Sequence, residues 1–160
     1  MGDLLGFTSL GLVFLFTLLL ALRFQEIFNV LFIALIVRFL LIIFGHYVAP
    51  LPDSTADAIS FEGRARHLGQ QGFLYVMSSY EGADPRFISW VIAIPYSLFG
   101  RSILMAQSIS LLFGIGSVFI GWRLASNLWN NNVARKVAWI IALFPSLVLY
   151  SVLILRETYM

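Results

Sequence analysis

The chain contains no cysteine, and only 11% of its 160 residues are charged. Without cysteine there can be no disulfide, no thiolate metal site and no cysteine nucleophile. The phosphate-binding Walker loop, the glycine pattern of dinucleotide-binding folds and the nucleophile elbow of hydrolases are also missing. The two histidines, His46 and His67, have no second ligand at a familiar metal spacing. We interpret both as surface or interfacial residues.

The chain is instead rich in apolar residues, which make up 60% of it, and its mean hydropathy is +0.91. Both values lie outside the range of ordinary soluble domains. Four runs approach the length of about 20 residues that a membrane span needs, and they cover 4–22, 27–49, 102–122 and 137–155. The run 88–100 is shorter and contains Pro95, so we expect an interfacial or re-entrant segment there. The sequence predicts an all-α integral membrane protein with about four transmembrane helices.

The first apolar run has two interpretations, a cleaved signal peptide or a retained helix. Asp3 stands where a signal peptide carries basic residues, and the run is long for a signal peptide. We therefore expect residues 1–26 to form an extra N-terminal transmembrane helix ahead of a module that covers 27–160.

The distribution of basic residues predicts the orientation of these helices. The connector 123–136 holds Arg123, Arg135 and Lys136 and no acidic residue. Because short cytoplasmic loops are enriched in basic residues, this connector is predicted to be cytoplasmic. Counting back through one span places the loop at about 50–101 on the periplasmic or extracellular side of the plasma (inner) membrane.

Two features within the spans concern packing. Arg38 interrupts the second run, where a charge is costly, so we expect it to face protein, water or lipid headgroups. The third run carries small residues at helical spacing, which favour close approach of another helix: Ser110, Gly114, Ser117 and Gly121.

The outer loop begins with a segment that has the pattern of an amphipathic surface helix, from about residue 55 to 70. Its apolar positions share one face: Ala58, Phe61, Ala65 and Leu68. Ser54 and Asp57 have the spacing of a capping box, so Asp57 either stabilises the helix start or acts as a general base. Glu62 is spaced to pair with Arg66.

Most acidic residues are predicted to lie on the outer side: Asp53, Asp57, Glu62, Glu81, Asp84 and Glu157. Asp53 and Asp57 are four residues apart and could share a divalent cation. Arg86 and Arg101 flank the short apolar run, where arginine either binds a lipid-linked phosphate through its fork of N–H groups or anchors a helix end at the headgroups.

The order of these parts resembles the N-terminal module of GT-C-type membrane glycosyltransferases related to protein mannosyltransferases and aminoarabinose transferases. The resemblance covers about residues 30–160 and lies in a series of features: Arg38 in a span, the stretch from Asp57 to Glu62 followed by Gly72, then 95–100 ending in Leu-Phe-Gly, Phe144-Pro145-Ser146, and the closing Leu155-Arg156-Glu157. Each part alone is unspecific, but their order and sidedness match.

The resemblance implies transfer of a sugar from a polyprenyl-phosphate-linked donor to an acceptor on the outer face. Asp57 corresponds to the family's catalytic acid in the first outer loop, and Glu157 to its second outer acid, which supports the site or a metal. Arg86 and Arg101 are the expected donor-phosphate ligands, with Asp53, Glu62 and Arg156 as supporting residues. No cofactor is required by these residues, although a divalent cation is compatible with them.

The chain also departs from the family pattern. Ala58 follows Asp57 where some relatives have a second acid, and Phe87 follows Arg86 where relatives have proline. Family members have eight or more spans, so we expect further transmembrane segments or a partner membrane subunit. Two alternatives are a non-catalytic scaffold that binds helices through the small-residue face, and a subunit that binds or transports a lipid carrier without transferring sugar.

Overall fold

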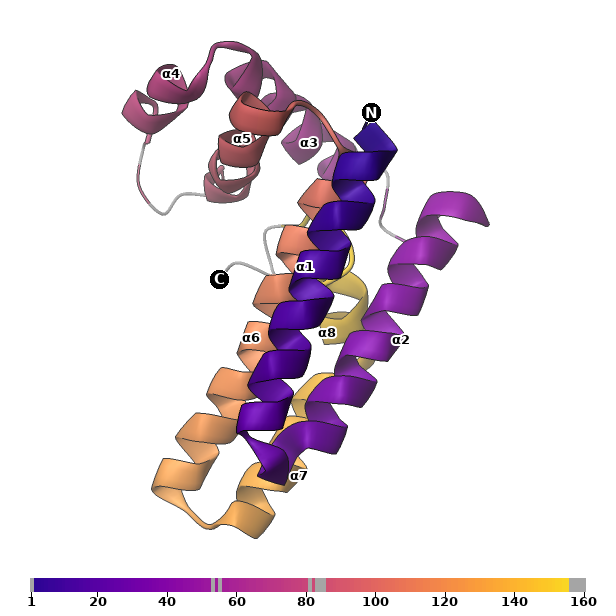
Figure 1. The fold of residues 1–160 in the computed structure, drawn as a ribbon, viewed down its shortest axis with the longest axis vertical. Helices are drawn as coiled ribbons and strands as arrows, with labels where there is room; N and C mark the ends of the chain where they lie inside the picture. Colours follow the sequence, from indigo (N-terminus) through magenta and orange to yellow (C-terminus); the bar gives the residue numbers. More distant parts are fainter. Residues whose placement is uncertain (1, 53, 55, 81, 83–85, 156–160) are drawn as a thin grey trace.

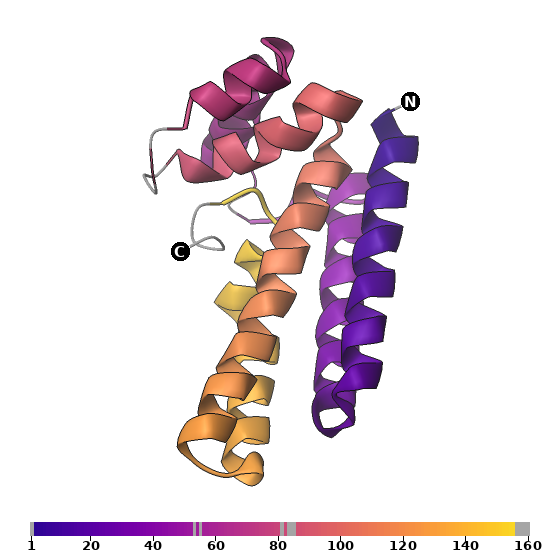
Figure 2. The ribbon, with the colours of Figure 1, turned by 60° about the vertical axis from the view of Figure 1, so that its left-hand side comes forward.

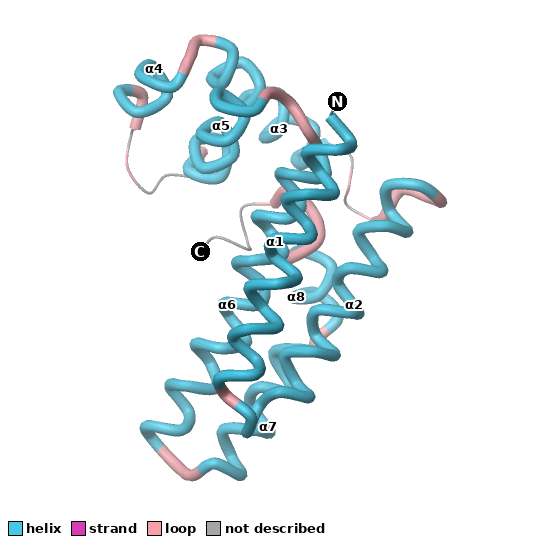
Figure 3. Tube along the Cα trace, viewed as in Figure 1, coloured by secondary structure: helices cyan, strands magenta, loops and turns pink. Residues whose placement is uncertain are grey.

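The computed structural model describes residues 2–52, 54, 56–80, 82 and 86–155. Within these residues every regular element is a helix (Figure 3). Three stretches are long and apolar enough to cross a membrane. They are α1 (Gly2–Arg23), α2 (Phe28–Tyr47) with the preceding 3₁₀ turn η1 (Gln25–Ile27), and α6 (Ile103–Leu128). The predicted all-α membrane fold is confirmed.

The fourth apolar run differs from the single helix that the sequence predicts over 137–155. It forms α7 (Asn131–Leu143) and then α8 (Pro145–Tyr150), with Phe144 between them in an extended conformation at ψ 119°. A residue before proline is driven out of the helical region by the proline ring, and proline has no N–H group to continue the helix. Pro145 therefore divides this run into two helices in series.

The outer-loop residues form a second group of helices, which we name the cap. The cap consists of α3 (Ala56–Gln70), α4 (Phe73–Ser78) and α5 (Phe87–Phe99), gathered at one end of the long helices (Figures 1 and 2). Gly72 and Gly100 have φ of 93° and 90°, a conformation that favours glycine, at the two turns that end α3 and α5. With 13 residues α5 is too short to cross a membrane.

The basic connector between α6 and α7 lies at the opposite end of the long helices from the cap (Figure 1). In chain order α1 runs away from the cap, α2 returns towards it, and α6 runs away again. The outer loop and the basic connector therefore lie at opposite ends of the long helices, as predicted from the sequence.

The long helices pack closely through the small-residue face of α6. A Cβ atom added to Gly114 would overlap the side chain of Ser151, and one added to Gly121 would overlap Ile141. Ser110 is also buried. On another face of α6, Ser108 is hydrogen-bonded to Ser9 of α1. The predicted packing is confirmed at Ser110, Gly114 and Gly121, and residues of this same chain cover the two glycines, whereas the fourth residue of the face, Ser117, is exposed.

Candidate functional site in the cap

The cap is held together by the apolar face predicted for α3. Ala58 and Ala65 are buried in the core, and α3 packs along α5. The Ser89 hydroxyl of α5 donates a 3.0 Å hydrogen bond to the Phe61 carbonyl oxygen of α3. Near the end of α3, Gly69 lies against Tyr96, where a Cβ atom would come within 2.9 Å of the tyrosine Cβ. The two helices therefore have a fixed register.

A cavity of about 350 Å³ opens between the three cap helices. Ligand sites commonly fall in this size range. Its lining combines cationic and aromatic side chains: Arg64, His67, Leu68, Tyr75, Ser79, Tyr80, Gly82, Arg86, Phe87 and Trp90. Arg64 and His67 come from α3, whereas Arg86 immediately precedes α5. We name it the cap cavity.

The aromatic wall of the cap cavity is fixed by contacts around Trp90. The Trp90 Nε1 group donates a 2.7 Å hydrogen bond to the Val76 carbonyl oxygen, which ties α5 to α4. The Tyr80 ring packs on Trp90 with 4.8 Å between centroids, and Phe87 stacks on Trp90 at 6.0 Å and also packs against Tyr80 at 6.4 Å. The cavity therefore pairs a preformed apolar surface with two guanidinium groups.

Asp57 is exposed in the first turn of α3. It precedes Arg64 by seven residues, so the two lie on nearly the same side of the helix, about 10 Å apart along its axis. Asp57 is not among the residues that line the cap cavity. The structure thus places the predicted general base on the helix that supplies Arg64, two turns before it.

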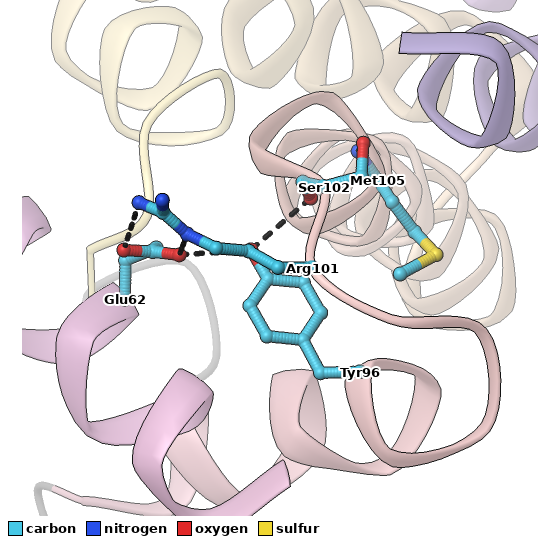
Figure 4. A network of polar contacts seen from close by, with 5 residues as sticks. All are labelled: Glu62, Tyr96, Arg101, Ser102 and Met105. Carbon is cyan, nitrogen blue, oxygen red and sulfur yellow. Dashed lines mark hydrogen bonds and ion pairs between the residues drawn. The ribbon is translucent and has the colours of Figure 1, made fainter. Parts of the chain in front are cut away.

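Glu62 has a different partner from the Arg66 suggested by helical spacing. Its two carboxylate oxygens accept hydrogen bonds from Arg101, at 2.7 Å from Nε and 3.0 Å from Nη2 (Figure 4). The Tyr96 hydroxyl lies 3.3 Å from the same carboxylate and 3.1 Å from the Ser102 carbonyl oxygen. The network joins α3 and α5 to the start of α6. Glu62 and Arg101 are too far apart in the chain for helical periodicity to predict their contact.

The network also changes the acid–base properties of its members. Burial, reinforced by the negative charge of Glu62, raises the pKa of Tyr96 well above its ordinary value. The hydrogen bond to Glu62 raises the pKa of Arg101 further. Two N–H groups of Arg101 are engaged by Glu62, so its contacts within the chain are structural. Its assignment as a donor-phosphate ligand stays a prediction.

Arg38 faces protein, as expected, and is almost completely buried in the bundle. Its Nε donates to the Ser151 hydroxyl at 2.7 Å, and its Nη1 donates to the Ala142 and Ala34 carbonyl oxygens at 2.8 and 3.3 Å. Ala34 is one helical turn before Arg38, whereas Ala142 and Ser151 were not apparent as partners in the sequence, because Ala142 lies near the end of α7 and Ser151 just after α8.

Five predicted residues lie outside the described part of the chain: Asp53, Glu81, Asp84, Arg156 and Glu157. Among the described residues, no three His, Asp or Glu side chains gather into a metal-binding group. Arg64 and His67 were missed as site residues by sequence reasoning. The sequence did contain an indication of their role. Both residues lie on the same predicted helix as Asp57, and that helix belongs to the same outer loop as Arg86.

No family model, no curated protein and no solved structure matches the chain.

Proposed function

We propose that the chain is a membrane glycosyltransferase, or its N-terminal part, that uses a polyprenyl-phosphate-linked sugar. The cap would lie on the periplasmic or extracellular face and would transfer the sugar to an acceptor there. The observation that carries the proposal is the cap cavity, in which Arg64 and Arg86 meet an aromatic wall at the end of three apolar helices.

The lining of the cap cavity suits a phosphorylated headgroup. Guanidinium groups bind phosphate oxygens through paired N–H donors and keep their charge at any physiological pH. The rings of Tyr80, Phe87 and Trp90 offer an apolar surface for a sugar ring or the first prenyl unit.

Asp57 is the residue proposed to act on the acceptor, as the resemblance to GT-C enzymes implies. Its carboxylate would take the proton from an acceptor hydroxyl while the hydroxyl oxygen attacks the anomeric carbon of the sugar. The bond between that carbon and the phosphate oxygen would break at the same step. The leaving group is then the polyprenyl phosphate, whose charge the arginines hold.

A carrier-binding subunit without transfer is the second candidate. It is favoured by the absence of Asp57 from the cavity lining, because binding requires only the arginines and the rings. A scaffold acting through the small-residue face of α6 has less support, since Ser151 and Ile141 already cover that face.

Binding is tested with the purified full chain in nanodiscs, using undecaprenyl phosphate as the probe. We expect Arg64→Gln and Arg86→Gln each to weaken binding about tenfold, the loss that about 1.4 kcal/mol produces. Arg66→Gln is the matched control, because Arg66 is an exposed arginine of α3 outside the cap cavity. Equal affinity in all three variants and the unaltered protein would contradict phosphate binding in this cavity.

Transfer is tested in membranes that contain the full chain and radiolabelled polyprenyl-phosphate sugars. Asp57→Asn should abolish transfer while preserving expression and undecaprenyl phosphate binding. Transfer that survives this substitution refutes the catalytic assignment. Binding without transfer in the unaltered protein, for every sugar and acceptor tried, would favour the carrier-binding subunit.

A further inference from the structure

A second large cavity lies at the end of the long helices opposite the cap. It measures about 590 Å³, is open to the outside, and is bordered by the turn between α1 and α2 and by the end of α6 with the start of α7. We name it the basal cavity. Because it belongs to the far end of the bundle, it is separate from the cap cavity and from the function proposed for the cap (Figure 1).

Three charged side chains line the basal cavity: Arg23, Arg123 and Glu26. All three are exposed, and none takes part in an ion pair within the described part of the chain. The cavity thus presents two fixed positive charges and one negative charge to an incoming molecule. A zwitterion with its own anionic and cationic groups can place an opposite charge beside the two arginines and beside Glu26 at the same time, which a simple anion cannot do.

The floor of the cavity is aromatic and rigid. The Trp122 side chain is buried, and the Phe24 ring packs against it with 5.7 Å between centroids. Phe119 packs on the same phenylalanine at 5.0 Å, so the turn after α1 and the helix α6 together hold the floor in place. The exposed amide of Asn127 adds a neutral hydrogen-bonding group to the rim.

The position of the cavity identifies the kind of molecule that reaches it. Arg23 ends α1, and Arg123 lies in the last turns of α6, so both charges occur where apolar spans end. At that depth a membrane presents its headgroups, with tryptophan and arginine at the boundary. A phospholipid headgroup is therefore the molecule that the cavity meets at the highest local concentration.

We propose that the basal cavity binds a phospholipid whose headgroup carries a phosphodiester and a primary ammonium. The phosphodiester contacts Arg23 and Arg123, and the ammonium group faces Glu26. Phosphatidylethanolamine has this chemistry. Phosphatidylglycerol lacks the cation, and phosphatidylcholine has a quaternary ammonium with no N–H group to donate to a carboxylate.

The test uses the purified full chain, titrated in detergent with each of the three lipids at identical acyl chains, and native mass spectrometry to count bound lipid. We expect phosphatidylethanolamine to bind at least tenfold more tightly than phosphatidylcholine and more tightly than phosphatidylglycerol. The Arg23→Gln/Arg123→Gln protein should lose this preference. Glu26→Gln should lower the affinity for phosphatidylethanolamine while leaving that for phosphatidylglycerol equal or higher.

The matched control is Arg135→Gln/Lys136→Gln, which removes two positive charges from the same end of the molecule but outside the cavity. This control should bind phosphatidylethanolamine like the unaltered protein. Equal binding of the three lipids, tighter binding of phosphatidylglycerol, or an equal loss in the control would each overturn the proposal. Size-exclusion profiles and helical circular dichroism identify any variant that fails to fold, in which case Arg23→Lys/Arg123→Lys replaces it and should keep measurable phosphatidylethanolamine binding.

Discussion

The contact between Glu62 and Arg101 yields a quantitative prediction about how the cap is attached to α6. The Glu62 side chain is only 10% exposed, whereas the Arg101 side chain is 45% exposed. When one partner is removed, the other has to find water or stay unpaired. The exposed arginine can be hydrated, but the buried carboxylate cannot. Removing Arg101 should therefore destabilise the protein more than removing Glu62.

The expected free energies follow from this asymmetry. Arg101→Gln leaves the buried carboxylate with only the 3.3 Å contact from Tyr96, and a buried charged group that loses its hydrogen-bond donor costs about 3 kcal/mol. Glu62→Gln leaves a carbonyl oxygen that still accepts from Arg101 or Tyr96, at a cost of about 1 kcal/mol. The two single variants should thus differ by about 2 kcal/mol in their free energy of unfolding.

The assay is reversible unfolding of the full chain in mixed micelles, followed by circular dichroism, for both single variants and the double variant. In the double variant no charge remains buried, so its destabilisation should be smaller than the sum of the single values by about 1–3 kcal/mol. Hydrogen exchange of the α3 amides would show whether the loss is local to the cap. Additive effects, or equal costs for the two single variants, would refute the reasoning.

Two further predictions follow from close contacts and from acid–base properties. Gly114→Ala should destabilise the protein by about 1–3 kcal/mol, because the new Cβ overlaps Ser151. The control Gly116→Ala, with nothing within 4 Å of the new atom, should be neutral or stabilising by up to about 1 kcal/mol in the same assay. Because the pKa of Tyr96 is raised in the folded state, the folded protein holds this proton more tightly than the unfolded chain does. The contribution of Tyr96 to stability should then be constant below about pH 10 and fall as the pH rises further, and Tyr96→Phe should show a smaller fall in thermal unfolding midpoint between pH 9 and 11.

The long helices were predictable because their signal is local. Runs of about 20 apolar residues bounded by charges define α1 and α2 within a few residues, and they define the start of α6. The helix α6 continues past the predicted end at 122 to Leu128. The apolar periodicity of α3 likewise predicted that Ala58 and Ala65 are buried. The prediction of a single helix over the fourth run was wrong because hydropathy does not report backbone geometry. Pro145 interrupts the helix, although the residues around it remain apolar.

The polar contacts were not predictable, because each joins residues far apart in the chain. Helical spacing predicted that Arg66 is the partner of Glu62. In the structure Arg101 donates to the Glu62 carboxylate instead, because α5 packs on α3 and brings Arg101 beside it. The cap cavity shows the same limitation. Arg86 was predicted as a phosphate ligand from its position beside an apolar run. Arg64 and His67 also line the cavity, but they were not predicted as site residues, because polar residues are expected on the outer face of any surface helix.

Arg38 and the break at Phe144 explain each other. In a continuous helix the Ala142 carbonyl oxygen would accept a hydrogen bond from the N–H group of Ser146. The extended conformation of Phe144 ends α7 before that bond, and a carbonyl at a helix end buried among apolar residues needs another donor. Arg38 supplies it at 2.8 Å and also bonds the Ser151 hydroxyl just after α8. Arg38, a charged residue within the apolar helix α2, thus supplies the hydrogen bond that the Ala142 carbonyl oxygen lacks because the fourth run is interrupted.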